Sequence, residues 1–267
     1  MRIGPVAGVV TRYLFLLSGS PARVLPLFAW ATLDVVLWGF ITRYLDQVAN
    51  SGFSFVPALL GAVLLWDFQT RVLHGVSLTF FEDVWSRNFL NLFASPMRVS
   101  EYLTGLVLTG FASSLIGLSV MLATAWALFG LTLAAYGAAA FPFVLVLVVF
   151  GLALGIFGAG VVLRFGPASE WFVWPIPGIV SPFVGVFYPV SVLPGWMQAV
   201  SKILPPSYVF EGLRGIAAGK GVSWPMLWAA AALAAGYVLL AGWFFAWVHR
   251  YAVRTGLIAR YSAESVN

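Results

Sequence analysis

Residues 138–163 read AAAFPFVLVLVVFGLALGIFGAGVVL, an apolar stretch of 26 residues without a charged side chain. A helix needs about 20 consecutive apolar residues to cross the hydrocarbon core of a membrane, so this stretch is long enough. The rest of the chain has the same character, because 61% of its 267 residues are hydrophobic and 9% are charged. A soluble domain has roughly 25% charged residues. The sequence therefore predicts an all-α membrane protein with a single transmembrane domain over residues 1–267.

Six membrane-spanning helices are predicted from the apolar stretches and the polar turns between them. They cover residues 24–44, 53–81, 102–128, 138–163, 171–188 and 224–247. The fifth stretch is interrupted by Pro175, Pro177 and Pro182. Ahead of the first span, apolar side chains recur near helical spacing between arginines, which predicts an amphipathic helix in the membrane interface over residues 1–23. A frayed arm is the alternative for that segment.

Arginine and lysine are distributed unevenly between the predicted connections. Six spans place both termini on one side of the membrane. That side would hold Arg2, Arg12, Arg23, Arg87, Arg98, Arg164, Arg250, Arg254 and Arg260, and the other side Arg43, Lys202, Arg214 and Lys220. Because cytoplasmic loops collect Arg and Lys, both termini, including the tail over residues 249–267, are predicted to be cytoplasmic. The net charge of +5 is thus interpreted as a topology signal and not as nucleic-acid binding.

Several kinds of chemistry are excluded by what the sequence lacks. It has no cysteine, which excludes disulfides and cysteine-ligated metals. His74 and His249 lie far apart, so no metal site is predicted. The nucleotide-binding pattern Gly-x-x-x-x-Gly-Lys-Ser/Thr is absent, since Gly219-Lys220-Gly221 has Arg214 where the first glycine belongs. No catalytic constellation is recognisable either. The chain is therefore predicted not to be an enzyme, and any energy source must be a partner or an ion gradient.

The connection over residues 82–101 has two faces at helical spacing. Its apolar face holds Val84, Trp85, Phe89, Leu92 and Phe93, and its polar face holds Asp83, Ser86, Arg87, Asn88 and Asn91. Asp83 and Arg87 stand at the i,i+4 spacing of an ion pair, and Ser95-Pro96 ends the helix. Such a helix in a cytoplasmic loop can dock against another protein. An interfacial helix without a partner is the alternative.

The segment over residues 189–223 contains four prolines and two short helical runs, residues 195–204 and 207–218. Broken backbone at membrane depth is tolerated only where protein or a water-filled cavity satisfies its polar groups. The segment is therefore predicted to be a re-entrant helical hairpin on the outer face, in which Glu211 and Arg214 could pair. A plain surface loop is the alternative, and the apolar content of the segment disfavours it.

Three charged residues fall inside predicted spans, namely Asp34, Asp67 and Arg71. Ionisable residues in a membrane are functional candidates. Asp67 and Arg71 have i,i+4 spacing, so a structural ion pair that joins the first two spans is favoured over a substrate or proton role. The alternative function is an ion-coupled secondary transporter with Asp34 or Asp67 as the carrier acid, although no internal repeat is recognisable. On the fourth span, Gly151, Gly155 and Ala159 form a small-residue ridge that predicts helix packing.

Three stretches resemble the type 2 class of ABC exporter permeases, which includes polysaccharide, teichoic-acid, nodulation-factor and antibiotic exporters. The first is FFEDVWSRN at residues 80–88, with ASP at 94–96 and EYL at 101–103. The second is SP at 181–182, FYPV at 187–190 and LPGW at 193–196. The third is LPPSY at 204–208 with EGLR at 211–214. Their order, the number of spans and the amphipathic amino-terminal helix also fit, so the resemblance covers nearly the whole chain.

The resemblance implies a role for each of these stretches. The first would be the coupling helix between the second and third spans, which contacts an ATPase through Glu82, Asp83, Trp85, Arg87, Asn88, Ser95, Pro96 and Arg98. Residues 164–170 would make a lesser contact. The outer gate would be formed by Tyr188, Pro189, Leu193, Trp196, Pro205, Pro206, Tyr208, Glu211 and Arg214. The family offers no role for Asp67 and Arg71.

The resemblance also implies an assembly. Two permease subunits, as a homodimer in a bacterial inner membrane, would be driven by two cytoplasmic ATPase subunits that bind ATP and Mg, while this chain binds no cofactor. Its contacts would be with these subunits and membrane lipid. The expected function is alternating-access export of an amphipathic, lipid-linked glycan or drug-like substrate from the cytoplasm or inner leaflet.

Overall fold

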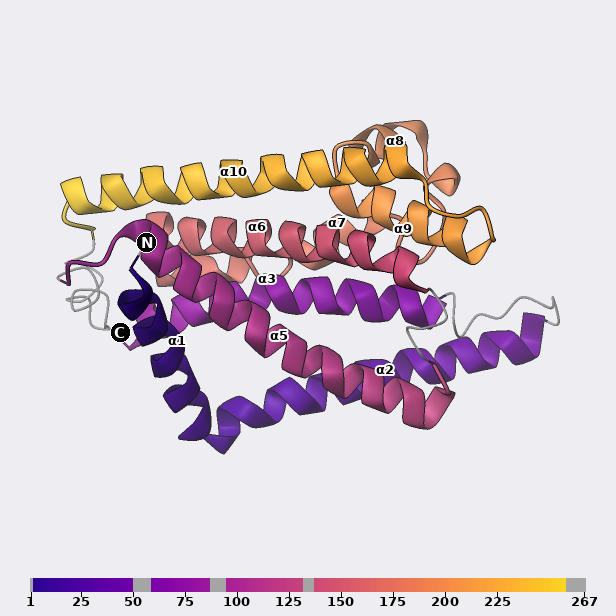
Figure 1. Ribbon diagram of the computed structural model, residues 1–267, viewed down its shortest axis with the longest axis horizontal. Coiled ribbons are helices and arrows are strands. Elements are labelled where there is room, and N and C mark those ends of the chain that lie inside the picture. The colour runs from indigo at the N-terminus through magenta and orange to yellow at the C-terminus, as the bar shows by residue number, and fades with distance from the viewer. Residues whose placement is uncertain (1, 50–58, 87–94, 132–136, 258–267) are drawn as a thin grey trace.

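A computed structural model describes residues 2–49, 59–86, 95–131 and 137–257, and within these ranges it contains helices and no strand. Five long helices form the body of the protein. They are α2 (Pro21–Ala49), α3 (Gly61–Trp85), α5 (Val99–Phe129), α6 (Phe141–Phe165) and α10 (Trp224–Arg254). These helices run along the long axis of the molecule (Figure 1), and α3 and α6 lie at its centre with α5 and α10 packed on either side.

Small residues let the central helices approach closely. A Cβ atom at Gly110 of α5 would lie 2.5 Å from the backbone nitrogen of Val76 in α3. On α6, a Cβ atom at Gly151 or Gly155 would lie 2.8 Å from a backbone oxygen of α3. The ridge of small residues predicted on the fourth span is therefore confirmed as a packing surface, and its partner is α3. Close approach of this kind is typical of helices that associate in a membrane.

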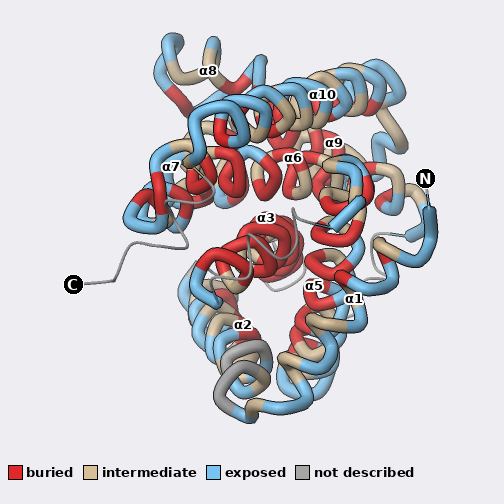
Figure 2. The backbone as a smooth tube through the Cα atoms, turned by 90° about the vertical axis from the view of Figure 1, so that its left-hand side faces the viewer, coloured by how far each residue is buried: buried red, intermediate tan, exposed pale blue. Residues whose placement is uncertain are grey.

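Three of the helices have the length and hydropathy needed to cross a membrane, as judged over the described residues: Val99–Phe129, Ala138–Phe165 and Trp224–Arg254. They correspond to the third, fourth and sixth predicted spans. The helices at the first and second predicted spans, α2 and α3, have 29 and 25 residues but also carry charged side chains. Exposed residues follow the outer sides of the bundle (Figure 2), and many large apolar side chains are exposed, such as Leu239 and Trp243 at 73% and 63%.

The fifth predicted span is not a continuous helix. Residues 171–188 fall instead in η4 (Pro167–Phe172), α7 (Ile176–Val180), η5 (Ser181–Phe183) and the turn that follows. Proline lacks the N–H that an internal helical bond needs, and three prolines in eight residues break the helix repeatedly. The broken segment still packs on α6, because a Cβ atom at Gly158 would lie 2.7 Å from Val173, and Val184 belongs to the same buried cluster as Phe143.

Each end of the bundle gathers elements that the sequence predicts on one side of the membrane. At one end lie α1 (Ile3–Ser18), the C-terminal end of α3, the start of α5 and the C-terminal end of α10 (Figure 1). At the other end lie α8 (Gly195–Ser201), α9 (Pro205–Ala217) and the start of α10. The first of these ends is called the α1 end below, and the second the hairpin end. That the α1 end faces the cytoplasm stays a prediction.

The α1 helix lies across its end of the bundle at an angle to the long helices (Figure 1). Val6 and Val9 are buried. Val9 packs closely on Gly105 of α5, where an added Cβ atom would lie 2.7 Å from the Cβ of Val9. Ile3, Leu14 and Phe15 are exposed. This division of apolar side chains agrees with an interfacial helix. The predicted cytoplasmic tail, residues 249–267, begins within helix α10, because α10 continues to Arg254.

Candidate functional site

Arg71 of α3 contacts two acids from two helices. Its Nε lies 2.7 Å from Oδ2 of Asp67, one turn earlier, and its Nη2 lies 3.9 Å from Oδ2 of Asp34 in α2. The stem of Arg71 passes over Gly117 of α5, where a Cβ atom would stand 3.0 Å from its Cδ. The structure thus contains the ion pair that the spacing predicts, and the guanidinium joins the first two long helices.

This cluster lines a cavity of about 670 Å³. The wall is formed by α1, α2, α3 and α5, together with Trp174 from the broken segment before α7. The ring of His74 packs against Trp174 with 4.7 Å between centroids. Trp30 and Trp85 add two further indole rings. The cavity therefore combines charged groups with aromatic walls, a composition suited to an amphipathic ligand.

Most of the cavity lining on α3 follows one helical face. Asp67, Arg71, His74, Leu78, Glu82 and Trp85 succeed one another at intervals of three or four residues. Side chains at that spacing stack along a single side of a helix. The sequence predicted Asp67 and Arg71 as intramembrane charges and missed His74, although this periodicity could have found it. Trp30 and Trp174 have no comparable signal, since they come from other segments.

A second polar cluster lies at the α1 end. The side chain of Asp83 in α3 is fully buried, and its Oδ2 accepts a hydrogen bond of 2.6 Å from the hydroxyl of Tyr102 in α5. Its Oδ1 pairs with the guanidinium of Arg12 in α1. Burial lowers the pKa of Arg12, and the nearby Tyr102 and Glu82 oppose that effect. One carboxylate therefore holds three helices together.

Glu101 of α5 makes a parallel set of contacts with the start of α1. Its Oε1 accepts a bond of 2.9 Å from the backbone N–H of Arg2, and its Oε2 lies 3.2 Å from Nη2 of Arg2. The backbone N–H of Arg98 also donates to Oε2, at 3.0 Å. As a result, α1 is tied to Asp83 of α3 and to Glu101 of α5, which lie near the two ends of the predicted coupling segment, residues 82–101.

These contacts correct one sequence-based placement. Asp83 was expected on a polar face open to a partner, but it is enclosed by Arg12 and Tyr102. Glu82 lies on the cavity wall, and Trp85 donates from Nε1 to Oε2 of Glu170 at 3.0 Å. Ser95, Pro96 and Arg98 precede α5 at the same end and are largely exposed. Arg87 and Asn88 lie outside the described residues.

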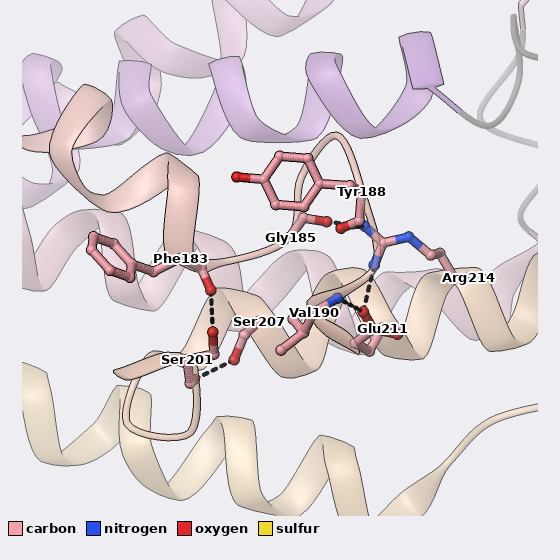
Figure 3. A network of polar contacts seen from close by, with 8 residues as sticks. All are labelled: Phe183, Gly185, Tyr188, Val190, Ser201, Ser207, Glu211 and Arg214. Carbon is pink, nitrogen blue, oxygen red and sulfur yellow. Dashed lines mark hydrogen bonds and ion pairs between the residues drawn. The ribbon is translucent and has the colours of Figure 1, made fainter. Parts of the chain in front are cut away.

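The predicted hairpin residues form a network of polar contacts at the hairpin end (Figure 3). Oε1 of Glu211 accepts bonds from the backbone N–H of Val190, at 2.7 Å, and from Nη1 of Arg214, at 2.9 Å. Nη2 of Arg214 donates to the carbonyl oxygens of Tyr188, at 2.8 Å, and of Gly185. The predicted Glu211–Arg214 pair is present, and it fastens the chain before α8 to helix α9.

Further hydroxyl groups close the same hairpin. Ser201 donates to the carbonyl oxygen of Phe183, and Ser207 donates to that of Ser201 (Figure 3). The hydroxyl of Tyr188 donates to the carbonyl oxygen of Pro182 at 2.8 Å. The hydroxyl of Tyr208 donates to the carbonyl oxygen of Lys202, also at 2.8 Å. Sequence reasoning missed both serines.

The remaining predicted hairpin residues occupy different positions. Pro205 and Pro206 are buried in the first turn of α9, where proline is tolerated because the first N–H groups of a helix have no intrahelical partner. Leu193 is buried as well, whereas Trp196 is 65% exposed. Pro189 directly precedes η6 (Val190–Val192). Phe187 stacks on Trp38 of α2 with 5.1 Å between ring centroids, which connects the hairpin to the helix that carries Asp34.

Comparison with known proteins adds a family to this geometry. The family model described as ABC-2 type transporter matches residues 22–217, which include the cavity-lining parts of α2, α3 and α5 and both helices of the hairpin. Comparison with curated proteins gave no match.

Proposed function

Because this chain belongs to the ABC-2 type transporter family and is thus a permease subunit of an ABC transporter, we propose that it exports an amphipathic substrate. The substrate would be a lipid-linked glycan or a drug-like compound, taken from the cytoplasm or the inner leaflet. The match over residues 22–217 carries the proposal, and it confirms the resemblance seen in the sequence. The printed sequence has no nucleotide-binding loop, so ATP and Mg would be bound by a separate ATPase subunit.

The proposed ATPase contact lies at the α1 end of the bundle, at the connections before α5 and after α6, and does not include α10. Two segments predicted to meet an ATPase, residues 82–101 and 164–170, are linked there by the hydrogen bond between Trp85 and Glu170. A single partner subunit could therefore press on both. Because Glu101 and Asp83 bind α1 near the two ends of the coupling segment, a push on that segment would move α1, α3 and α5 together.

The proposed substrate path begins at the cavity around Arg71 and leads toward the hairpin. The stack of Phe187 on Trp38 provides a contact through which movement of α2 could reach the hairpin. In a homodimer, alternating access would open this path to one side at a time. The alternative of an ion-coupled carrier acid receives less support, because Asp67 and Asp34 are both engaged by Arg71.

The proposal is tested by isolating the full chain from its native membranes and identifying copurifying proteins by mass spectrometry. We expect a nucleotide-binding subunit in a one-to-one ratio. Arg98→Glu reverses an exposed charge at the α1 end and should weaken the recovery of that subunit by about tenfold, as expected when a charge pair at an interface is broken. Arg254→Glu is the matched control, since Arg254 is exposed at the end of α10.

The control should retain the ATPase subunit, substrate-stimulated ATP hydrolysis and transport. If no nucleotide-binding subunit is recovered with the unmodified chain, the proposed assembly is wrong. If Arg98→Glu and Arg254→Glu behave alike, Arg98 is not part of the ATPase contact.

A further inference from the structure

The cavity around Arg71 carries more negative than positive charge. Three carboxyl groups line it, those of Asp34, Asp67 and Glu82, against the single guanidinium of Arg71. Arg71 is shared between Asp67 at 2.7 Å and Asp34 at 3.9 Å, and the Asp34 side chain stays 43% exposed. Arg12, on the neighbouring α1, is engaged by the buried Asp83. The charge on the lining therefore favours a cation inside the cavity.

Aromatic rings supply a second feature that attracts a cation. Trp30, Trp85, Trp174 and Tyr13 all line this one cavity. The face of an aromatic ring is electron-rich, and tryptophan binds an ammonium or other organic cation best. The same rings also present apolar surface to the body of a ligand. Trp30 and Trp85 are 63% and 48% exposed, so part of their surface is available for contact.

Polar atoms on the wall fit the same kind of ligand. The Nε2 of His74 and the Oγ1 of Thr70 are buried and have no hydrogen-bond partner within the described part of the chain. The imidazole of His74 is hydrogen-bonded to the backbone of Trp174. When the other ring nitrogen carries the proton, Nε2 accepts a hydrogen bond, and a hydroxyl oxygen does so as well. Both atoms could accept from the N–H groups of an amine.

We propose that this cavity binds an amphipathic organic cation, with an amine or ammonium group on an apolar or aromatic body. Its volume of about 670 Å³ lies inside the range of drug-sized ligand sites, about 300–1,000 Å³. An anionic lipid-linked glycan would meet like charge on the wall, which is unfavourable in a site of low dielectric. The inference rests on the proposed export function, because it names the substrate class of the same site.

The test uses two probes of nearly the same shape and opposite charge, tetraphenylphosphonium and tetraphenylborate. Their binding to the purified full-length chain in neutral detergent is measured by equilibrium dialysis, with protein-free micelles as the blank. We expect the cation to bind at least about tenfold more tightly than the anion, since Coulomb attraction between a cation and partly desolvated carboxylates is of that order.

The carboxylates are tested by Asp34→Asn, which removes one charge and keeps the shape. It should weaken cation binding about five- to tenfold and leave the anion unaffected or bound more tightly. The matched control is Asp46→Asn, because Asp46 lies on the same helix and does not line the cavity. Glu82→Gln is a second cavity variant for the case in which Asp34→Asn elutes as aggregate in size-exclusion chromatography.

Equal binding of the two probes, preference for the borate, or no binding of either probe would overturn the inference. So would cation binding that is unchanged in both cavity variants. Recovery of the ATPase subunit is scored on the same preparations. A chain that retains its ATPase but does not prefer the cation keeps the proposed function and loses only the substrate class, whereas a chain that binds the cation without any ATPase loses the exporter assignment.

Discussion

The two ends of the bundle are stabilised by different kinds of polar contact. At the α1 end, charged side chains on separate helices pair with one another, as Arg12 does with Asp83 and Arg2 with Glu101. At the hairpin end, Glu211 and Arg214 stand on one helix and bond mainly to backbone groups of residues 185–190. The first arrangement sets the positions of whole helices relative to one another. The second fixes the shape of a single connection.

This difference fits the parts that the two ends would have in transport. In the proposed mechanism, the α1 end would receive a push from an ATPase and transmit it through the ion pairs that join α1 to α3 and α1 to α5. The hairpin, proposed to face outward, would keep its shape while the helices below it move, because its side chains bond to backbone groups. The comparison predicts that changes at the α1 end affect the whole bundle and that changes at the hairpin end stay local.

The largest effect is expected for Asp83→Ala at the α1 end. This change leaves the half-buried Arg12 without its partner and removes the acceptor of the Tyr102 hydroxyl. Loss of one member of a buried ion pair costs about 3–5 kcal/mol. Thermal unfolding of the purified chain in detergent should show one large downward shift of the whole transition. Arg12→Ala/Asp83→Ala should be less damaging than the sum of the single changes, and strict additivity would show that the two groups do not interact.

A smaller and local effect is expected for Arg214→Ala at the hairpin end. It removes donors from the carbonyl oxygens of Tyr188 and Gly185 and the partner of Glu211. A hydrogen bond to a charged group contributes about 1.5–3 kcal/mol. We expect faster proteolysis within residues 185–195 and a modest change in the unfolding temperature. Lys220→Ala, an exposed cation beyond α9, is the control. A shift as large as that of Asp83→Ala would contradict the proposed difference between the two ends.

The intermediate region around Arg71 sharpens the comparison. Asp67 and Arg71 are neighbours on one helix, as at the hairpin end, but Arg71 also reaches Asp34 on another helix, as at the α1 end. The two side chains of the close pair are 20% and 15% exposed, so water reduces the cost of losing one partner to about 1–2 kcal/mol. We expect Asp67→Ala/Arg71→Ala to lower the unfolding temperature by less than the sum of the two single changes. Additive losses would show that the close pair contributes no coupling energy.

Some features of this protein were determined by the sequence itself. The membrane setting follows from composition, and the Asp67–Arg71 and Glu211–Arg214 pairs follow from spacing of one helical turn. The contact surface of Gly151 and Gly155 follows from a repeat of small residues. The broken fifth segment was marked by its prolines, although its division into short helices was not. All of these depend on residues close together in the chain, where periodicity and backbone chemistry decide the outcome.

Other features were decided only by the tertiary structure. The bond of Arg2 to Glu101 joins positions 99 residues apart, and Tyr102 reaches Asp83 across 19. Spacing along the chain does not determine which of several arginines meets a given acid after the helices have packed. For the same reason Asp83, placed on an open face by periodicity, became buried when α1 and α5 covered it. The cavity also arises at this level, because Trp30 and Trp174 share no local pattern with the α3 residues and meet them only where the packed helices leave a space.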